Sequence, residues 1–152
     1  MKTFPELRIA LASDHAGYTL KQAVQNFLQQ QGAQTHDFGC YGTDSCDYPD
    51  FAHPMAVAVE QGDYDYGIAI CSTGNGITMT ANKHQGIRAA LCWEIRLAEL
   101  ARQHNNANVL GLPSNFISQD FALDIVRVFF STDFEGGRHL RRINKIPCEP
   151  IC

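Results

Sequence analysis

The sequence has no long hydrophobic run, and this absence indicates where in the cell the protein is located. None of its apolar stretches approaches the roughly 20 residues that span a bilayer. Residues 1–12 are interrupted by Pro5, Glu6 and Arg8 and lack the pattern of a signal peptide. We therefore expect no membrane association and a cytoplasmic location.

An excess of basic residues and closely spaced cysteine pairs are also lacking. Twelve Lys and Arg stand against 16 Asp and Glu, a formal net charge of −4, whereas nucleic-acid surfaces need clustered basic residues. The six cysteines contain no Cys-x-x-Cys pair, so we expect reduced thiols and no nucleic-acid partner. No metal site is expected either, because one candidate cluster matches no compact zinc spacing: His36, Cys40, Cys46 and His53.

What the sequence does contain is an alternation of short apolar runs with amphipathic segments. Its 152 residues, 45% hydrophobic and 18% charged, are typical of one globular domain. The patterns predict strands at 7–12, 33–38, 66–71, 87–92 and 109–112, and helices at 18–31, 51–61, 77–82, 94–104 and 118–131. Gly32 would end the first helix, and Asp50 and Ser118 would cap two others. We expect a single domain over residues 1–152, of the α/β class: a three-layer, doubly wound, five-stranded parallel sheet of flavodoxin-like order, Rossmann-like, with a C-terminal helical extension.

The most informative stretch is 68–76, Ile-Ala-Ile-Cys-Ser-Thr-Gly-Asn-Gly. It delivers Cys71 to a glycine-rich turn at the carboxyl end of a strand, where ligands bind in parallel α/β proteins. Unpaired N–H groups in such a turn favour an anion, and their partial positive charge favours a thiolate. Cys71 could equally be a buried core residue, with Gly74 and Gly76 serving only a tight turn.

Other chemically capable residues follow the predicted strands. Asp14 and His15 follow the first strand, Asp47 and Tyr48 close a later loop, and His104 ends a helix. Each has a structural explanation as a helix cap or a turn residue. The segment 136–142 is basic, and its Arg138 and Arg142 would share one helix face, although a basic tail is commonly a solvated surface.

Together these motifs make the chain resemble the ribose-5-phosphate isomerase B family, which includes the galactose-6-phosphate isomerase subunits. The resemblance runs nearly end to end, through the motifs at 13–17, 47–50, 71–76, 81–83, 86–89, 102–105, 108–110 and 135–139. It implies interconversion of an aldose phosphate and a ketose phosphate, ribose 5-phosphate and ribulose 5-phosphate, through an enediolate and without metal or cofactor.

The resemblance also implies roles for individual residues. Cys71 matches the base that moves the proton, and His104 matches the acid that opens the furanose ring. Thr73 and Asp47 would assist these two by hydrogen bonding. His15, Arg138 and Arg142 would bind the phosphate of the substrate. The full set of implied substrate-binding residues is Asp14, His15, Tyr48, Ser72, Gly74, Asn75, Gly76, Asn105, Arg138 and Arg142. A second subunit would complete the site, in a homodimer or homotetramer.

One position departs from the family pattern. The arginine of the family's Gly-x-Arg turn aligns with Asn115, and the loss of a charge-assisted contact costs about 1.5–3 kcal/mol unless another cation, such as Arg141, replaces it. The substrate could therefore be a different sugar phosphate, such as allose or galactose 6-phosphate.

Two other readings compete with an isomerase. The phosphate loop of a thiol phosphatase, Cys-x5-Arg, is nearly excluded because Ile77 stands at the arginine position. A non-catalytic flavodoxin-like nucleotide-binding module would use residues 72–75 as a phosphate turn, but such turns usually follow the first strand. A subunit that needs a different partner chain is a further possibility, against which the presence of both Cys71 and His104 argues.

Overall fold

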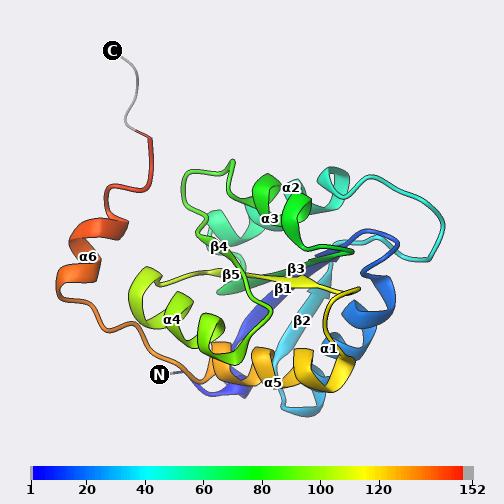
Figure 1. Cartoon of the computed structure of the whole chain (residues 1–152), viewed down its shortest axis with the longest axis horizontal. Coiled ribbons are helices and arrows are strands. Elements are labelled where there is room, and N and C mark those ends of the chain that lie inside the picture. Colours follow the sequence, from blue (N-terminus) through cyan, green and yellow to red (C-terminus); the bar gives the residue numbers. More distant parts are fainter. Residues whose placement is uncertain (1, 149–152) are drawn as a thin grey trace.

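A five-stranded parallel sheet forms the centre of the computed structural model, which describes residues 2–148 (Figure 1). The strands are β1 (Arg8–Ser13), β2 (Gln34–Asp37), β3 (Tyr66–Cys71), β4 (Ala89–Leu91) and β5 (Val109–Pro113). All four pairings are parallel, in the order β2-β1-β3-β5-β4. The three inner strands are buried almost throughout, as strands covered on both faces must be.

The predicted fold class is confirmed, with one difference in strand order. In flavodoxin order the fourth strand would lie beside β3, whereas here β5 takes that place and β4 forms the edge. The strand predicted over 87–92 is reduced to Ala89–Leu91, and all three residues are only half-buried. A short, partly exposed strand suits an edge, and the fully buried β5 suits the interior.

Helices cover both faces of the sheet. The core cluster on one face combines inner-strand side chains with those of α1 (Tyr18–Gln30), α4 (Ile95–Asn105) and α5 (Gln119–Phe130). The core cluster on the other face includes α2 (Pro49–Glu60) and α3 (Asn75–Ala81). The last helix, α6 (Arg138–Ile143), lies beyond α4 at the periphery and forms the expected C-terminal extension (Figure 1). Among the described residues, no helix is long and apolar enough to cross a membrane.

Two of the three predicted helix boundaries hold. Gly32 follows α1 with a φ of 91°, and the Ser118 hydroxyl accepts a hydrogen bond from the Phe121 N–H at 3.2 Å. The prediction that Asp50 caps α2 is wrong. Tyr48 is the N-cap and Pro49 opens the helix, so Asp50 lies in its first turn. Proline favours the first helical position because its φ is already helical and its missing N–H has no helical partner there.

Candidate active site

Three loops meet at the carboxyl end of the sheet. The Asp14 N–H donates to the Ile70 carbonyl at 3.2 Å, and the Ser114 N–H donates to the Cys71 carbonyl at 3.0 Å. These bonds fix the loops after β1 and β5 to the end of β3. The structure thus gathers the predicted residues of the first and third strand ends around Cys71.

Cys71 is the last residue of β3 and is 4% exposed. The turn after it requires glycine at Gly74, whose φ is 74° and whose added Cβ would lie 2.3 Å from Leu91 Cδ1. Thr73 Oγ1 accepts the Asn75 N–H at 3.2 Å. The Asn75 N–H is therefore already used within the loop and is not free to bind an anion. The N–H groups of Gly74 and Gly76 precede the first intrahelical hydrogen bonds of α3 and remain as candidate donors.

Tyr48 closes one side of this turn. A Cβ added to Gly76 would lie 2.5 Å from Tyr48 Cζ and 2.7 Å from its hydroxyl oxygen. The phenol ring therefore packs directly on the backbone at Gly76. Asp47, one residue earlier, is exposed. The loop that enters α2 and the glycine turn consequently form one surface.

The loop after β1 is held on both sides. Asp14 is 7% exposed, and its Oδ1 accepts the Gly17 N–H at 2.9 Å. His15 Nδ1 accepts the Cys46 N–H at 3.2 Å. A neutral His15 therefore carries its ring hydrogen on Nε2, where it can donate to a ligand. Sequence reasoning missed the Cys46 contact, because no spacing pattern links a backbone N–H to a histidine 31 residues away.

Two other cysteines, Cys46 and Cys92, carry thiols that are hard to ionise. Burial raises the pKa of the Cys92 thiol to about 12. Burial, and then contact with Cys40, raise the pKa of the Cys46 thiol above its ordinary value. Both therefore remain protonated at neutral pH.

Asn115 is fixed against the catalytic loop. Its side-chain Nδ2 donates to Ser72 Oγ at 2.8 Å, and its N–H donates to the Ser72 carbonyl at 3.1 Å. The residue in the place of the family's arginine thus holds the turn and brings no charge. Arg141 lies on α6, so it does not replace that charge within the same chain.

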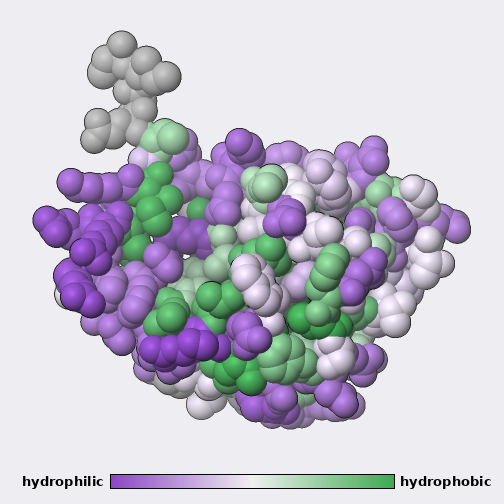
Figure 2. All heavy atoms as spheres, in the orientation of Figure 1, coloured by the Kyte–Doolittle hydropathy of each residue, from purple (hydrophilic) through white to green (hydrophobic). Residues whose placement is uncertain are grey.

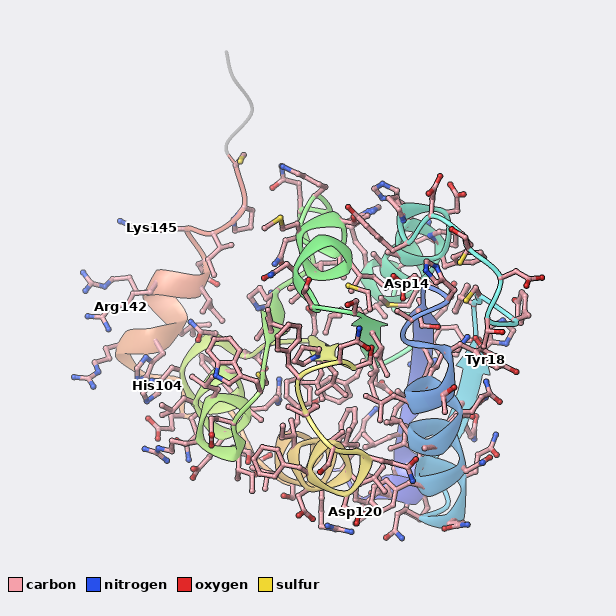
Figure 3. The ribbon with its side chains drawn as sticks, turned by 45° about the vertical axis from the view of Figure 1, so that its right-hand side comes forward. Asp14, Tyr18, His104, Asp120, Arg142 and Lys145 are labelled. Carbon is pink, nitrogen blue, oxygen red and sulfur yellow. The ribbon has the colours of Figure 1, made fainter. Side chains whose placement is uncertain are left out.

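A second group of predicted residues lies at the opposite end of the sheet. His104 and Asn105 end α4, and Arg138 and Arg142 lie on α6. The chain turns from α4 into the start of β5, whereas Cys71 pairs with Pro113 at its end. The length of β5 alone therefore separates the two groups by roughly 13 Å, at about 3.3 Å per residue. Figure 3 shows Asp14 and His104 on opposite sides of the molecule, with Arg142 beside His104.

Two histidines and a carboxylate make up the core of this second group. The rings of His104 and His139 stack with centroids 4.2 Å apart and planes 8° from parallel. Glu135 Oε2 lies 3.9 Å from His104 Nε2 and 3.5 Å from His139 Nε2. The motif at 135–139 contains Glu135 and His139, but the sequence reasoning gave them no role. The sequence did carry one signal for this contact, since Glu135 and His139 are four residues apart.

These three residues could be considered as metal ligands, because their ligand atoms lie within 4.8 Å of one another. Parallel stacked rings direct their nitrogen lone pairs side by side rather than at one point, so they cannot both bind one ion as they stand. The arginines of α6 also repel a cation, and Figure 2 shows hydrophilic side chains crowded over this helix. The arrangement fits an anionic ligand better than a metal.

Comparison with known proteins identifies the family. A family model described as Ribose/Galactose Isomerase matches residues 9–146. The chain belongs to this family. Ribose-5-phosphate isomerase B of Escherichia coli is 41% identical over 139 residues, which cover 91% of this chain and 93% of that protein.

Solved structures of family members agree. The ribose 5-phosphate isomerase of Thermotoga maritima has a TM-score of 0.92 and 47% identity, with 93% of this chain and 98% of that chain covered. Ribose-5-phosphate isomerase B of Mycoplasma genitalium, solved with bound ribulose-5-phosphate, has a TM-score of 0.89 and 46% identity, with 93% and 94% covered. The resemblance found in the motifs is confirmed.

Proposed function

We propose that this family member is an aldose-ketose isomerase of type B that interconverts ribose 5-phosphate and ribulose 5-phosphate in pentose phosphate metabolism. The observation that carries the proposal is Cys71 at the buried end of β3, beside a turn that only glycine can form. The Mycoplasma relative with bound ribulose-5-phosphate supports the choice of substrate. A cytoplasmic location stays a prediction from the sequence.

Proton transfer is assigned to Cys71. Its thiolate takes the proton from C2 of the open aldose, and the electron pair of that C–H bond forms the C1–C2 double bond while the carbonyl oxygen becomes an oxyanion. Return of that proton to C1, with transfer of the C2 hydroxyl proton to the C1 oxyanion, gives the ketose. Backbone N–H groups at Gly74 and Gly76 are positioned to stabilise the oxyanion.

Ring opening is assigned to His104. Its imidazolium gives a proton to the ring oxygen as the C1–O bond breaks, and the anomeric hydroxyl proton leaves to a base. Thr73 and Asp47 assist through hydrogen bonds. His15, Arg138 and Arg142 hold the phosphate, since guanidinium groups offer paired donors to its oxygens.

The distance between the two groups supports a shared site in a homodimer. Cys71 and His104 lie at opposite ends of one sheet, and in the proposed dimer a second copy brings its own His104 to the first copy's Cys71. Exposed apolar side chains support such a contact. Trp93 and Phe116, 51% and 71% exposed, line a hollow of about 510 Å³ beside Thr73.

The reaction is tested by incubating the purified protein with ribose 5-phosphate and a chelator in deuterated water. NMR should show ketose formation and deuterium uptake, and both should disappear in Cys71→Ala. Allose and galactose 6-phosphates are run in parallel, because Asn115 supplies no phosphate charge. Failure with all three substrates would refute the isomerase proposal.

The shared site is tested by mixing two inactive variants, Cys71→Ala and His104→Ala. A two-fold dimer formed from one copy of each has one intact site, so random subunit exchange should restore about a quarter of wild-type activity. Each variant refolded alone serves as the control. A mixture that exchanges subunits and stays inactive would show that both residues act within one copy.

A further inference from the structure

The stack of His104 and His139 restricts how His104 can act. His104 is partly open to solvent, with 38% of its side chain exposed, whereas the side chain of His139 is 9% exposed. With the rings 4.2 Å apart and nearly parallel, one face of His104 is covered. Its ring can therefore turn only a little without losing this contact.

The charges around the stack decide which ring carries a proton. Two imidazolium rings in contact would repel each other, so a proton on one ring disfavours a proton on the other. Burial lowers the pKa of His139, and His104 and Arg138 lower it further. His104 is more exposed and lies in the last turn of α4, where the helix dipole favours a cation. Of the two rings, His104 is therefore the better placed to carry the proton that ring opening needs.

Glu135 supplies the opposing charge. Its carboxylate oxygen lies within 4 Å of Nε2 of both rings, which favours a protonated pair. The other charged groups facing the stack are Arg138 and Arg142, which disfavour one. Glu135 therefore offsets the arginines that the phosphate requires.

Resting on the function proposed above, we propose that His139 and Glu135 are positioning residues for ring opening. His139 holds the plane of His104 and leaves the proton on it, while Glu135 keeps that proton in place beside two arginines. Neither needs to touch the substrate. This role concerns the opening of the closed sugar and not proton transfer at Cys71.

The two steps can be measured separately. Ribose 5-phosphate is mainly a closed furanose, whereas ribulose 5-phosphate cannot form one because its C5 oxygen carries the phosphate. Isomerisation of ribose 5-phosphate therefore includes ring opening. Deuterium exchange at C1 of ribulose 5-phosphate reports proton transfer alone.

Four variants test the inference: His139→Leu removes the stacking ring, His139→Phe keeps one, Glu135→Gln removes the charge, and Glu99→Gln is the control. Glu99 is a carboxylate on α4 that pairs with Arg96 and accepts a hydrogen bond from the Gln103 side chain, and its partners include neither ring of the stack. His139→Leu and Glu135→Gln should slow isomerisation about tenfold or more, because each would remove part of the 10²–10⁴-fold that a general acid contributes. Deuterium exchange at C1 of ribulose 5-phosphate should change by less than about twofold. His139→Phe should recover most of the loss.

The pH profile gives a second readout. An acid works in its protonated form, so the rate falls as pH rises, and loss of the Glu135 charge should move that fall to lower pH. Glu99→Gln should leave it in place. Equal losses of isomerisation and exchange, with an unmoved pH profile, would mean a merely structural role and overturn the inference. Wild-type protein that exchanges no deuterium would instead overturn the proposed function, and the inference with it.

Discussion

The contact between Tyr48 and Gly76 predicts a specific coupling between the start of α2 and the glycine turn after Cys71. In Gly76→Ala the new methyl carbon would begin 2.5 Å from Tyr48 Cζ and 2.9 Å from Cε1. An ordinary contact is about 3.5–4.0 Å, so the ring must move by roughly 1 Å. Overpacking of this kind costs about 1–3 kcal/mol. Gly76 has no positive φ, so the cost is steric alone.

A double-mutant cycle with Tyr48→Ala measures this cost. Urea unfolding should show that Gly76→Ala loses about 1–3 kcal/mol in the wild-type background and nearly nothing when the ring is absent. The isomerase rate should fall with Gly76→Ala, because the displaced ring is a predicted substrate contact. Gly42→Ala is the matched control, since nothing lies within 4 Å of its added Cβ. An equal loss in both backgrounds would refute the packing argument.

Three further predictions concern other parts of the molecule. Thr78 Oγ1 is buried with no partner among the described residues, so Thr78→Val should stabilise the protein by about 1 kcal/mol in urea unfolding, and a loss would contradict this. Burial raises the pKa of Asp65, but hydrogen bonds from Arg8 and Lys2 outweigh it and lower that pKa to about 2. The ionised Asp65 carboxylate therefore stabilises the fold above its unfolded pKa of about 3.9, and this contribution is lost as pH falls toward 2. Because its partners Arg8 and Lys2 are about half exposed, the contribution is about 1 kcal/mol. Asp65→Asn should remove this acid dependence from thermal unfolding. Asn115→Arg should lower KM for ribose 5-phosphate about tenfold with little change in kcat, and an unchanged KM would show that this position does not reach the phosphate.

The sequence was sufficient for the elements and their class because the inner strands are buried on both faces. Such strands are almost continuously apolar, so β1, β3 and β5 could be recognised from their residues alone. The edge strand β4 is half-buried, and its pattern was therefore too weak to give its ends. Strand order was not predictable in full, because periodicity reports the type of an element and not which neighbour it pairs with.

The candidate site also has features that the sequence predicts and features that it does not. The motif placed Cys71 at the end of a strand and a glycine turn after it, since both are properties of a continuous segment. The bonds from Asn115 to Ser72 and from Cys46 to His15 depend on how separate loops fold against each other. The stack of His104 on His139 likewise depends on how α6 packs beside α4, which no local pattern contains.

The topology of the sheet is the physical reason for proposing a site shared by two copies. Right-handed crossovers in a parallel sheet place every strand-to-helix loop at one end and every helix-to-strand connection at the other. Cys71 follows β3, and His104 precedes β5, so they occupy opposite ends whatever the side chains do. No small loop movement can bridge the length of a strand. In the proposed homodimer, a two-fold axis would lay the His104 end of each copy on the Cys71 end of the other and would complete two sites at once.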